Sequence, residues 1–345
     1  MDFRLNDEQQ ALQQAAKDFC RKEITSTVVR AAFEGPDGDA PELSKKMAEL
    51  GWLGITVPEE HGGLGMGWVE QAVVCEQLGL QDAPGPYFST ACLAIPALVA
   101  LGAGDLLSQL LDGSKRATVA WDRDAVIDAQ IADAFVVTDG DRARWLAREQ
   151  VVVTPKQTVD GTRRLGAIEA KAEGRDLGSA EPLHFRTDGR ATAADAMAVM
   201  LAAEMVGCMQ WALDTTVAYV KDRHQFGRPI GSFQAVQHRC ADMLVQTEAS
   251  RSAAYYAAYA LSEGLADAAH AASVAKAYCS DAVHFVTGEC IQLHGGIGFT
   301  WEHDAHLYFK RATTNRALLG DAAYHYDRLV TLDPDVRGSD PSRSS

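Results

Sequence analysis

The sequence predicts a mainly α-helical protein with a small β middle domain. Apolar residues follow a helical spacing in the first third of the chain and again in the alanine-rich part from residue 191 onward. Between them, residues 117–188 consist of short β-branched runs separated by Asp and Gly turns. A chain of 345 residues is long enough to pack these segments around a sizeable core.

Residues 1–116 are expected to form an N-terminal α-helical domain. Its first helix is predicted by an apolar stripe that repeats about every 3.6 residues, formed by Leu5, Leu12, Ala16, Phe19 and Ile24. Asn6 or Asp7 can cap this helix. Further helices are expected over residues 68–80 and 93–113, after a glycine-rich turn at residues 62–65.

Residues 117–190 are expected to form a shortened β middle domain. Strands are predicted in four stretches, which read ATVAW, DAFVVTD, VVVTPKQTVDGTRRLGAIEAK and PLHFRTDG. Their β-branched residues favour a pleated sheet, and the Asp and Gly residues between them favour turns.

Residues 191–333 are expected to form a C-terminal four-helix bundle. Its long helices are predicted from residue 191 to about 222, and over about 235–264, 266–293 and 304–332. The tail, residues 334–345, has the Pro, Ser, Gly and charge mixture of a disordered end.

Composition and charge exclude several classes of partner, location and site. A formal charge of −15 argues against nucleic acid and anionic membranes as partners, and no run of about 18 apolar residues predicts a membrane span. The N-terminus lacks the features of a signal peptide, and the seven cysteines show no disulfide or zinc spacing. We therefore expect a cytoplasmic protein with reduced core thiols. No metal site is predicted either, because His303 and His306 are not accompanied by suitable carboxylates.

Two stretches interrupt the helical pattern of the C-terminal part. In RHQFGRPIGSFQAVQHRCADM (223–243), Arg223 ends one helix, Phe226 follows it, and Gln234 opens the next helix. A guanidinium beside a helix start suits a phosphate or pyrophosphate. In QLHGGIGF (292–299), the glycines allow a close backbone approach. From the residues alone, a structural salt bridge of Arg223 and a glycine C-cap remain alternatives.

Four segments together resemble the acyl-CoA dehydrogenase family along nearly the whole chain. They are LNDEQQAL, LGWLGITVPEEHGGLGMG, the 223–243 stretch and CIQLHGGIGFTWEHDAHLYFKRA. The resemblance implies a helical domain, a β middle domain and a four-helix bundle. It also implies that FAD is shared across a subunit interface, with its adenosine-diphosphate half held by the two stretches. Arg223 and Gln234 would then bind the pyrophosphate and adenosine, and Phe226 would pack on the adenine side. The same end would be lined by Gln292, Leu293, His294, Gly295 and Gly296.

The residues expected for catalysis are missing. The family removes an α-proton from an acyl-CoA thioester with a carboxylate base, and most members carry that base as a Glu before a glycine. Here Leu319 occupies the position before Gly320, and the alternative position falls at about Met197–Ala198. The nearest acids are Asp195, Glu204 and Asp321, for which solvated or capping roles are expected. The segments that normally surround the flavin ring are also absent from the middle domain.

The resemblance therefore implies a subunit without its own active site. It is similar to the short, non-catalytic chains of actinobacterial α2β2 acyl-CoA dehydrogenases that act on steroid side-chain CoA esters. A paralogous catalytic subunit would supply the base and bind most of the acyl-CoA, and electron-transfer flavoprotein is a further candidate partner. One alternative is a self-sufficient homo-oligomeric dehydrogenase with a displaced base, Asp321 or Glu204. The other is a flavin-free scaffold of the same fold.

Overall fold

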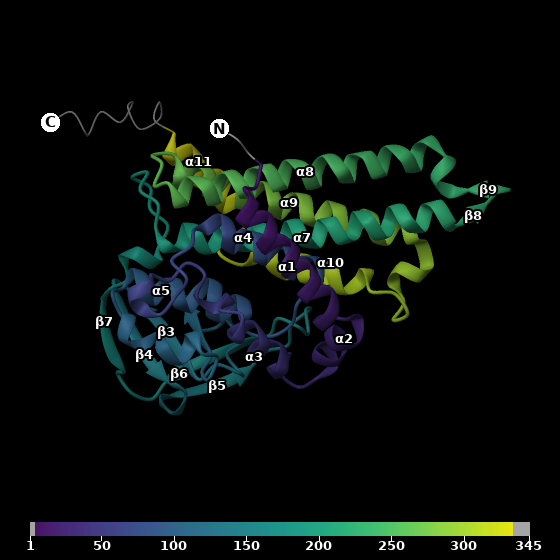
Figure 1. The fold of residues 1–345 in the computed structure, drawn as a ribbon. Helices are drawn as coiled ribbons and strands as arrows, with labels where there is room; N and C mark the ends of the chain where they lie inside the picture. Colours follow the sequence, from purple (N-terminus) through teal and green to yellow (C-terminus); the bar gives the residue numbers. More distant parts are fainter. Residues whose placement is uncertain (1–3, 334–345) are drawn as a thin grey trace. The chain divides into compact units, whose positions relative to one another are not determined.

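The computed structural model describes residues 4–333, and the predicted tail at residues 334–345 lies outside them. Two compact units are present, Arg4–His184 and the part of the chain from Phe185 onward (Figure 1). The first contains short helices and sheets, and the second is a bundle of long helices, as the predicted fold class requires. The predicted boundary at residue 116 stays a prediction.

Two helices of the first unit, α1 and α4, begin where the sequence predicts them. Asn6, rather than Asp7, caps the first helix, and the side-chain oxygen of Gln9 accepts a hydrogen bond from the Asn6 backbone N–H. Residues 93–113 are less regular than expected, because a π-helical segment, Phe88–Ala94, leads into α5 and Pro96 removes a backbone donor there. The α-helices are α1 (Asp7–Glu23), α2 (Ser26–Glu34), α3 (Pro41–Glu49), α4 (Trp68–Leu80), α5 (Ile95–Ala100) and α6 (Ser108–Leu111).

The β region contains two sheets rather than one. Their strand orders are β1-β3-β4-β7, in which β1 and β3 are parallel, and β2-β6-β5, which is antiparallel. Phe135, Leu146 and Val151 share one buried core between the strands. The strands are β1 (Ala117–Ala120), β2 (Val126–Ile127), β3 (Ala134–Asp139), β4 (Arg142–Ala147), β5 (Val151–Pro155), β6 (Leu165–Ala170) and β7 (Arg175–Ser179).

One strand prediction is wrong, and three strands were not predicted. The run PLHFRTDG forms no strand, because Pro182 lies in a 3-10 turn, Glu181–Leu183. β2 has only two residues, and β4 and β7 are rich in Arg, Asp, Ala and Gly. Those strands form because their neighbours in the sheet supply the pairing, a tertiary effect that overrides their weak β propensity.

The second unit is built around α9, which packs against every other long helix of the bundle. Alanine and other small residues on α9 allow this close packing. A short hairpin of β8 (His224–Gln225) and β9 (Arg228–Pro229) projects beyond the ends of α7 and α8 (Figure 1). The helices are α7 (Ala193–Asp222), α8 (Gln234–Ser262), α9 (Ala268–His294), α10 (Ala305–Ala317) and α11 (Ala322–Leu332).

The predicted last helix, 304–332, is in fact two helices. Leu319 and Gly320 have φ of +57° and +85°, which breaks the chain between α10 and α11. The break is held from inside the bundle. The buried Lys276 ammonium donates to the carbonyl of Gly320 at 2.7 Å, and His325 donates to the carbonyl of Leu319 at 2.9 Å. These side chains satisfy the backbone groups that a continuous helix would have paired internally.

By length and composition α7 could span a membrane, contrary to the expectation that no segment of the chain would do so. Its most apolar stretch is 89% buried within the chain itself, which is the behaviour of a core helix. All seven cysteines are free thiols, and six are buried.

Candidate functional site

The predicted cofactor residues gather at one end of the bundle. Arg223 is the C-cap of α7, and the β8–β9 hairpin begins directly after it. Gln234 is the first residue of α8, and Gln292 lies in the last turn of α9. Tyr219, one helical turn before Arg223, stacks on His294 with ring centroids 4.4 Å apart. The two stretches, about seventy residues apart in the sequence, are therefore neighbours in space.

Phe226 has an unusual conformation at the tip of the hairpin. Both central residues of the turn have positive φ, +53° for Phe226 and +77° for Gly227, as in a type I′ turn. Such a turn favours Asn or Gly, and a left-handed conformation costs an aromatic residue about 1 kcal/mol. Phe226 is nevertheless 89% exposed, and its ring lies edge-to-face with that of Phe233, with centroids 6.1 Å apart. A strained, exposed aromatic ring is typical of a binding position rather than of a packing position.

Positive charge surrounds the start of α8. Arg223 is exposed, and the guanidinium of Arg228 lies 4.0 Å from the centre of the Phe233 ring. Neither side chain is paired with a carboxylate among residues 4–333. No side chain caps the α8 N-terminus, whose free N–H groups and helix dipole favour an anion. In a chain with a net charge of −15, this end is suited to a phosphate.

The glycine stretch leaves space at the end of α9. Gly295 has φ +64°, and a Cβ added at Gly295 or Gly296 would meet nothing within 4 Å. Gly298 differs, because its Cβ would lie 2.8 Å from the carbonyl oxygen of Ile291. The first two glycines therefore keep the loop backbone open to a neighbour, and the third allows the loop to pack on its own helix.

His294 is the buried member of the set, whereas Leu293 beside it is half-buried. The Nδ1–H of His294 donates to the carbonyl of Cys290 at 2.7 Å. Burial lowers the pKa of His294, which favours the neutral ring. Its Nε2 is buried and has no hydrogen-bond partner. This acceptor is therefore left unsatisfied at the end of α9.

The position of the missing base is part of a rigid buried network. Arg328 donates to Asp195 at 2.5 Å and to Ser273 at 2.9 Å. The Ser273 hydroxyl lies 3.2 Å from Nδ1 of His325, and Nε2 of that ring donates to Leu319. Burial lowers the pKa of His325 to about 4, so the ring is neutral at neutral pH and carries its proton on Nε2.

The three acids near the expected base positions all have structural contacts. Asp195 forms the Arg328 pair and the capping box of α7, and burial raises its pKa. Glu204 accepts from Arg311 at 2.7 Å and from Asn315 at 3.3 Å inside the bundle. Asp321 caps α11 through the Tyr324 backbone. At the second possible base position, Met197 and Ala198 are fully buried apolar residues of α7.

Several site residues were not predicted. Tyr219 lies four residues before Arg223, so helical spacing could have placed it on the same end. Lys276 is a lone cation in an alanine-rich stretch, which is a signal of a buried lysine, and burial lowers its pKa to about 8. The histidines near α10 pack on aromatic rings, His303 on His294 and His306 on Trp301. Among the described residues no group of three or more His, Cys, Asp or Glu side chains could hold a metal ion.

Comparison with known proteins identifies the family. Models of the acyl-CoA dehydrogenase N-terminal and C-terminal domains match residues 6–113 and 191–330. The chain is 37% identical to acyl-CoA dehydrogenase IpdE2 of Mycolicibacterium smegmatis, over 94% of this chain and 98% of that protein. It is 34% identical to FadE34 of Mycobacterium tuberculosis over 95% of this chain, but only 48% of that protein.

Solved structures agree with this result. The chain matches a component of the ChsE4–ChsE5 complex from M. tuberculosis with a TM-score of 0.86 and 26% identity, over 99% of this chain and 100% of that one. It matches a variant of the Tcur3481–Tcur3483 steroid ACAD with a TM-score of 0.84 and 28% identity, over 96% and 99%. Members of the matched family generally bind FAD, and membership supports an oxidoreductase role. The chain belongs to the acyl-CoA dehydrogenase family.

Proposed function

We propose that this chain is one subunit of an FAD-dependent acyl-CoA dehydrogenase, and that a paralogous catalytic subunit completes its active site. The reaction is the α,β-dehydrogenation of an acyl-CoA thioester. The observation that carries the proposal is the end of the bundle, which holds a strained, exposed Phe226, two arginines without a carboxylate partner among residues 4–333 and an open glycine loop. A flavin-free scaffold has no need of this combination.

The residues at this end fit the adenosine-diphosphate half of FAD. Arg223 and the first turn of α8, including Gln234, bind the pyrophosphate and adenosine, and Phe226 packs on the adenine side. Gln292, Leu293, Gly295 and Gly296 lie at the same end of the bundle, where the open space at the two glycines admits a ligand. His294 lies beside them at the end of α9, with its Nε2 buried and without a hydrogen-bond partner. When bound, FAD supplies the acceptor for the hydride that leaves the β-carbon of the substrate.

Among residues 4–333, no free carboxylate lies at the positions where the base for the α-proton is expected. Leu319 stands where a glutamate is expected, and Asp195, Glu204 and Asp321 are each held in an ion pair or a cap. A base must reach the substrate α-carbon with a free carboxylate oxygen. This arrangement supports the proposal that the paralogous subunit supplies the base and binds most of the acyl-CoA.

The relatives point to a two-component enzyme for bulky substrates. One solved relative is a steroid ACAD and another belongs to a complex of two named chains. In FadE34 the stretch similar to this chain is about half of the polypeptide, which leaves room for a second unit of similar size. We propose a cytoplasmic α2β2 assembly acting on a steroid side-chain CoA ester, with electron-transfer flavoprotein as its electron acceptor.

Flavin content of the lone chain and of the pair tests the proposal. The chain is expressed alone and with a longer family member encoded beside it, and FAD is quantified per polypeptide. We expect one flavin for each pair of chains and activity only in the pair. Arg223→Ala should lower the retained flavin, whereas Arg142→Ala, another exposed arginine far from these stretches in sequence, should not. A lone chain that binds flavin one-to-one and is bleached by an acyl-CoA would show a self-sufficient enzyme instead.

A further inference from the structure

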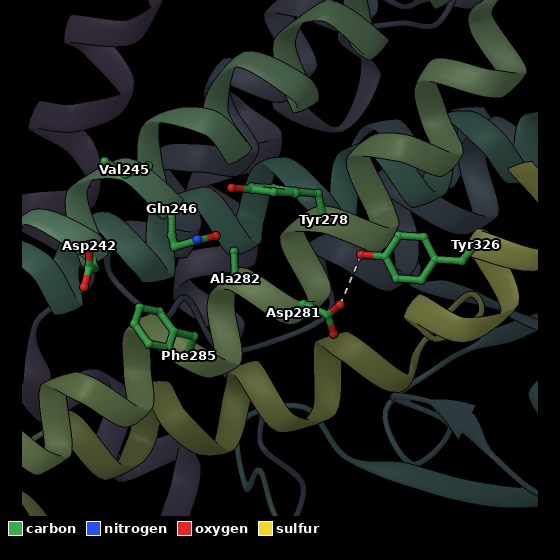
Figure 2. Close-up of a pocket in the computed structure, with 8 residues that line it drawn as sticks. All are labelled: Asp242, Val245, Gln246, Tyr278, Asp281, Ala282, Phe285 and Tyr326. Carbon is green, nitrogen blue, oxygen red and sulfur yellow. Dashed lines mark hydrogen bonds between the residues drawn. The ribbon is translucent and has the colours of Figure 1, made fainter. Parts of the chain in front are cut away.

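Two features of residues 4–333 have no part in the proposed function. One is an open groove between α8 and α9, with a volume of about 360 Å³ (Figure 2). Its lining contains no thiol, amine or imidazole, and Figure 2 shows the hydroxyl of Tyr326 directed at Asp281, to which it donates at 3.2 Å. The other is a cluster of buried thiols in the first unit. Of the two, the thiol cluster holds side chains that can react.

Cys75 and Cys92 form the centre of this cluster. Cys75 lies on α4 and Cys92 on the π-helical segment Phe88–Ala94, and their exposed fractions are 2% and 0%. Their sulfur atoms are 3.5 Å apart, which is direct contact. A disulfide has a sulfur–sulfur distance of about 2.05 Å. A closing movement of roughly 1.5 Å is therefore enough to join α4 to the π-helical segment.

The π-helical segment is suited to this movement. The backbone N–H of Ile95 donates to the carbonyl of Thr90, five residues earlier, instead of to that of Ala91. Hydrogen bonds of this spacing are rare and occur mostly as short interruptions of α-helices, frequently at functional sites. Rewinding such a segment changes the position of its side chains. Cys92 can therefore approach Cys75 without disrupting α4.

The side chain of Gln71 surrounds the two sulfur atoms with a polar group. Gln71 lies on α4, one turn before Cys75, and is 1% exposed. Its Nε2 donates to the Tyr87 hydroxyl at 2.8 Å and lies 3.6 Å from the sulfur of Cys92 and 4.0 Å from that of Cys75. The Tyr87 hydroxyl in turn donates to the carbonyl of Trp52 at 3.2 Å. An amide donor directed at sulfur stabilises the negative charge that develops when the thiol loses its proton.

Cys20 shows that burial alone does not make a thiol of this unit reactive. It lies on α1 and is 1% exposed. Burial raises the pKa of Cys20 to about 12, so this thiol stays protonated at neutral pH. A protonated thiol is a poor nucleophile. The sulfur–sulfur contact and the amide donor therefore distinguish Cys75 and Cys92 as the reactive pair.

We propose that Cys75 and Cys92 form a reversible disulfide when a hydroperoxide reaches them. One thiolate attacks the peroxide, so that an S–O bond forms, the O–O bond breaks and water or an alcohol leaves. The second thiol attacks the resulting sulfenic sulfur, so that the S–S bond forms, the S–O bond breaks and water leaves. The two cysteines together lose two electrons and two protons, which the peroxide gains. A dithiol reductant reverses the reaction by thiol–disulfide exchange.

The disulfide would restrain a segment that contacts the β region. Ser89 donates to Asp128 at 2.6 Å. The Thr90 hydroxyl bonds both the carbonyl and the N–H of Ala117, the first residue of β1. Oxidation of Cys92, two residues further along the segment, therefore reaches contacts between the helices and the sheets of the first unit. The reaction needs neither flavin nor the paralogous subunit.

The test is the loss of alkylation at the two cysteines after peroxide treatment. The full chain is treated with hydrogen peroxide in its folded state, unfolded, alkylated and cleaved after glutamate, which separates Cys75 from Cys92 at Glu76. We expect linked peptides containing Cys75 and Cys92, and recovery of both thiols with dithiothreitol. The same treatment in urea should give mixed pairs, because unfolding removes the contact between the two sulfur atoms.

Two variants separate this reaction from general oxidation. Cys92→Ser should abolish the linked peptides, whereas Cys20→Ser, the matched buried thiol, should leave them unchanged. Full alkylation of Cys75 and Cys92, at a peroxide dose that oxidises the exposed Met66, would overturn the proposal. A disulfide from Cys20 to either cysteine in the folded chain would refute the assigned pairing. Because no flavin is measured, these outcomes are independent of the proposed function.

Discussion

Replacing Glu204 with glutamine separates a structural role of this carboxylate from a catalytic one. Glu204 and Arg311 are both almost fully buried, and their 2.7 Å contact joins α7 to α10 across 107 residues of sequence. Removing the negative charge leaves the buried guanidinium without the Glu204 carboxylate. Breaking one side of a buried pair costs about 3–5 kcal/mol of unfolding free energy.

This cost translates into a large thermal shift. For a domain of this size, about 1 kcal/mol lowers the unfolding midpoint by roughly 2–4 °C. Glu204→Gln should therefore lower the midpoint of the co-expressed complex by roughly 6–20 °C. The double variant Glu204→Leu, Arg311→Met removes both charges and should recover much of the loss, because apolar replacements of a buried pair are often neutral.

The assay combines differential scanning calorimetry with dehydrogenase activity measured well below the unfolding midpoint. We expect reduced stability and retained activity per folded complex. If Glu204→Gln keeps the wild-type midpoint but abolishes turnover, the carboxylate acts as a base, and the structural reasoning is wrong.

Three further predictions concern the α10–α11 break and the cofactor end. His325 has a pKa of about 4 in the folded chain and about 6.5 when unfolded. The free energy of unfolding, measured by urea titration, should therefore fall by up to about 3 kcal/mol as the pH decreases from 6.5 to 4. His325→Asn should abolish this pH dependence. Gly320→Ala should lower the free energy of unfolding by about 1–3 kcal/mol, because φ is +85° and the new Cβ would lie 2.5 Å from Tyr324. The control Gly102→Ala, at φ +67° with open space around it, should lower it less in the same denaturant titration. Phe226→Ala should lower the amount of flavin retained in gel filtration. It should leave the unfolding midpoint of the lone chain unchanged, because Phe226 is 89% exposed. A lowered midpoint with normal flavin content would contradict a binding role.

Local signals in the sequence predicted the helices well. The cap and apolar spacing of the first helix, and the spans of α7, α8 and α9, all follow from short-range patterns. Failures occurred where distant residues decide the conformation. The break at Leu319–Gly320 depends on Lys276, more than forty residues earlier, and β4 and β7 depend on their neighbours in the sheet.

The candidate site shows the same division. The residue types of the site could be read from two short stretches of the sequence. The sequence also showed that position 319 holds a leucine instead of the expected glutamate. Three features of the site could not be predicted from these stretches: the open space at Gly295, the strained turn at Phe226 and the stacking of Tyr219 on His294. They depend on how α7 and α9 end beside one another.

The sequence by itself therefore determined the fold class and the family, and it predicted the residues proposed to bind a cofactor, because helical periodicity and motif spacing are local properties of the chain. Only the tertiary structure decided the roles of Asp195, Glu204 and Asp321. The sequence shows where a carboxylate lies along the chain but not which distant groups surround it. Whether it caps a helix, neutralises a buried arginine or faces a substrate is determined by which distant groups the fold brings to it.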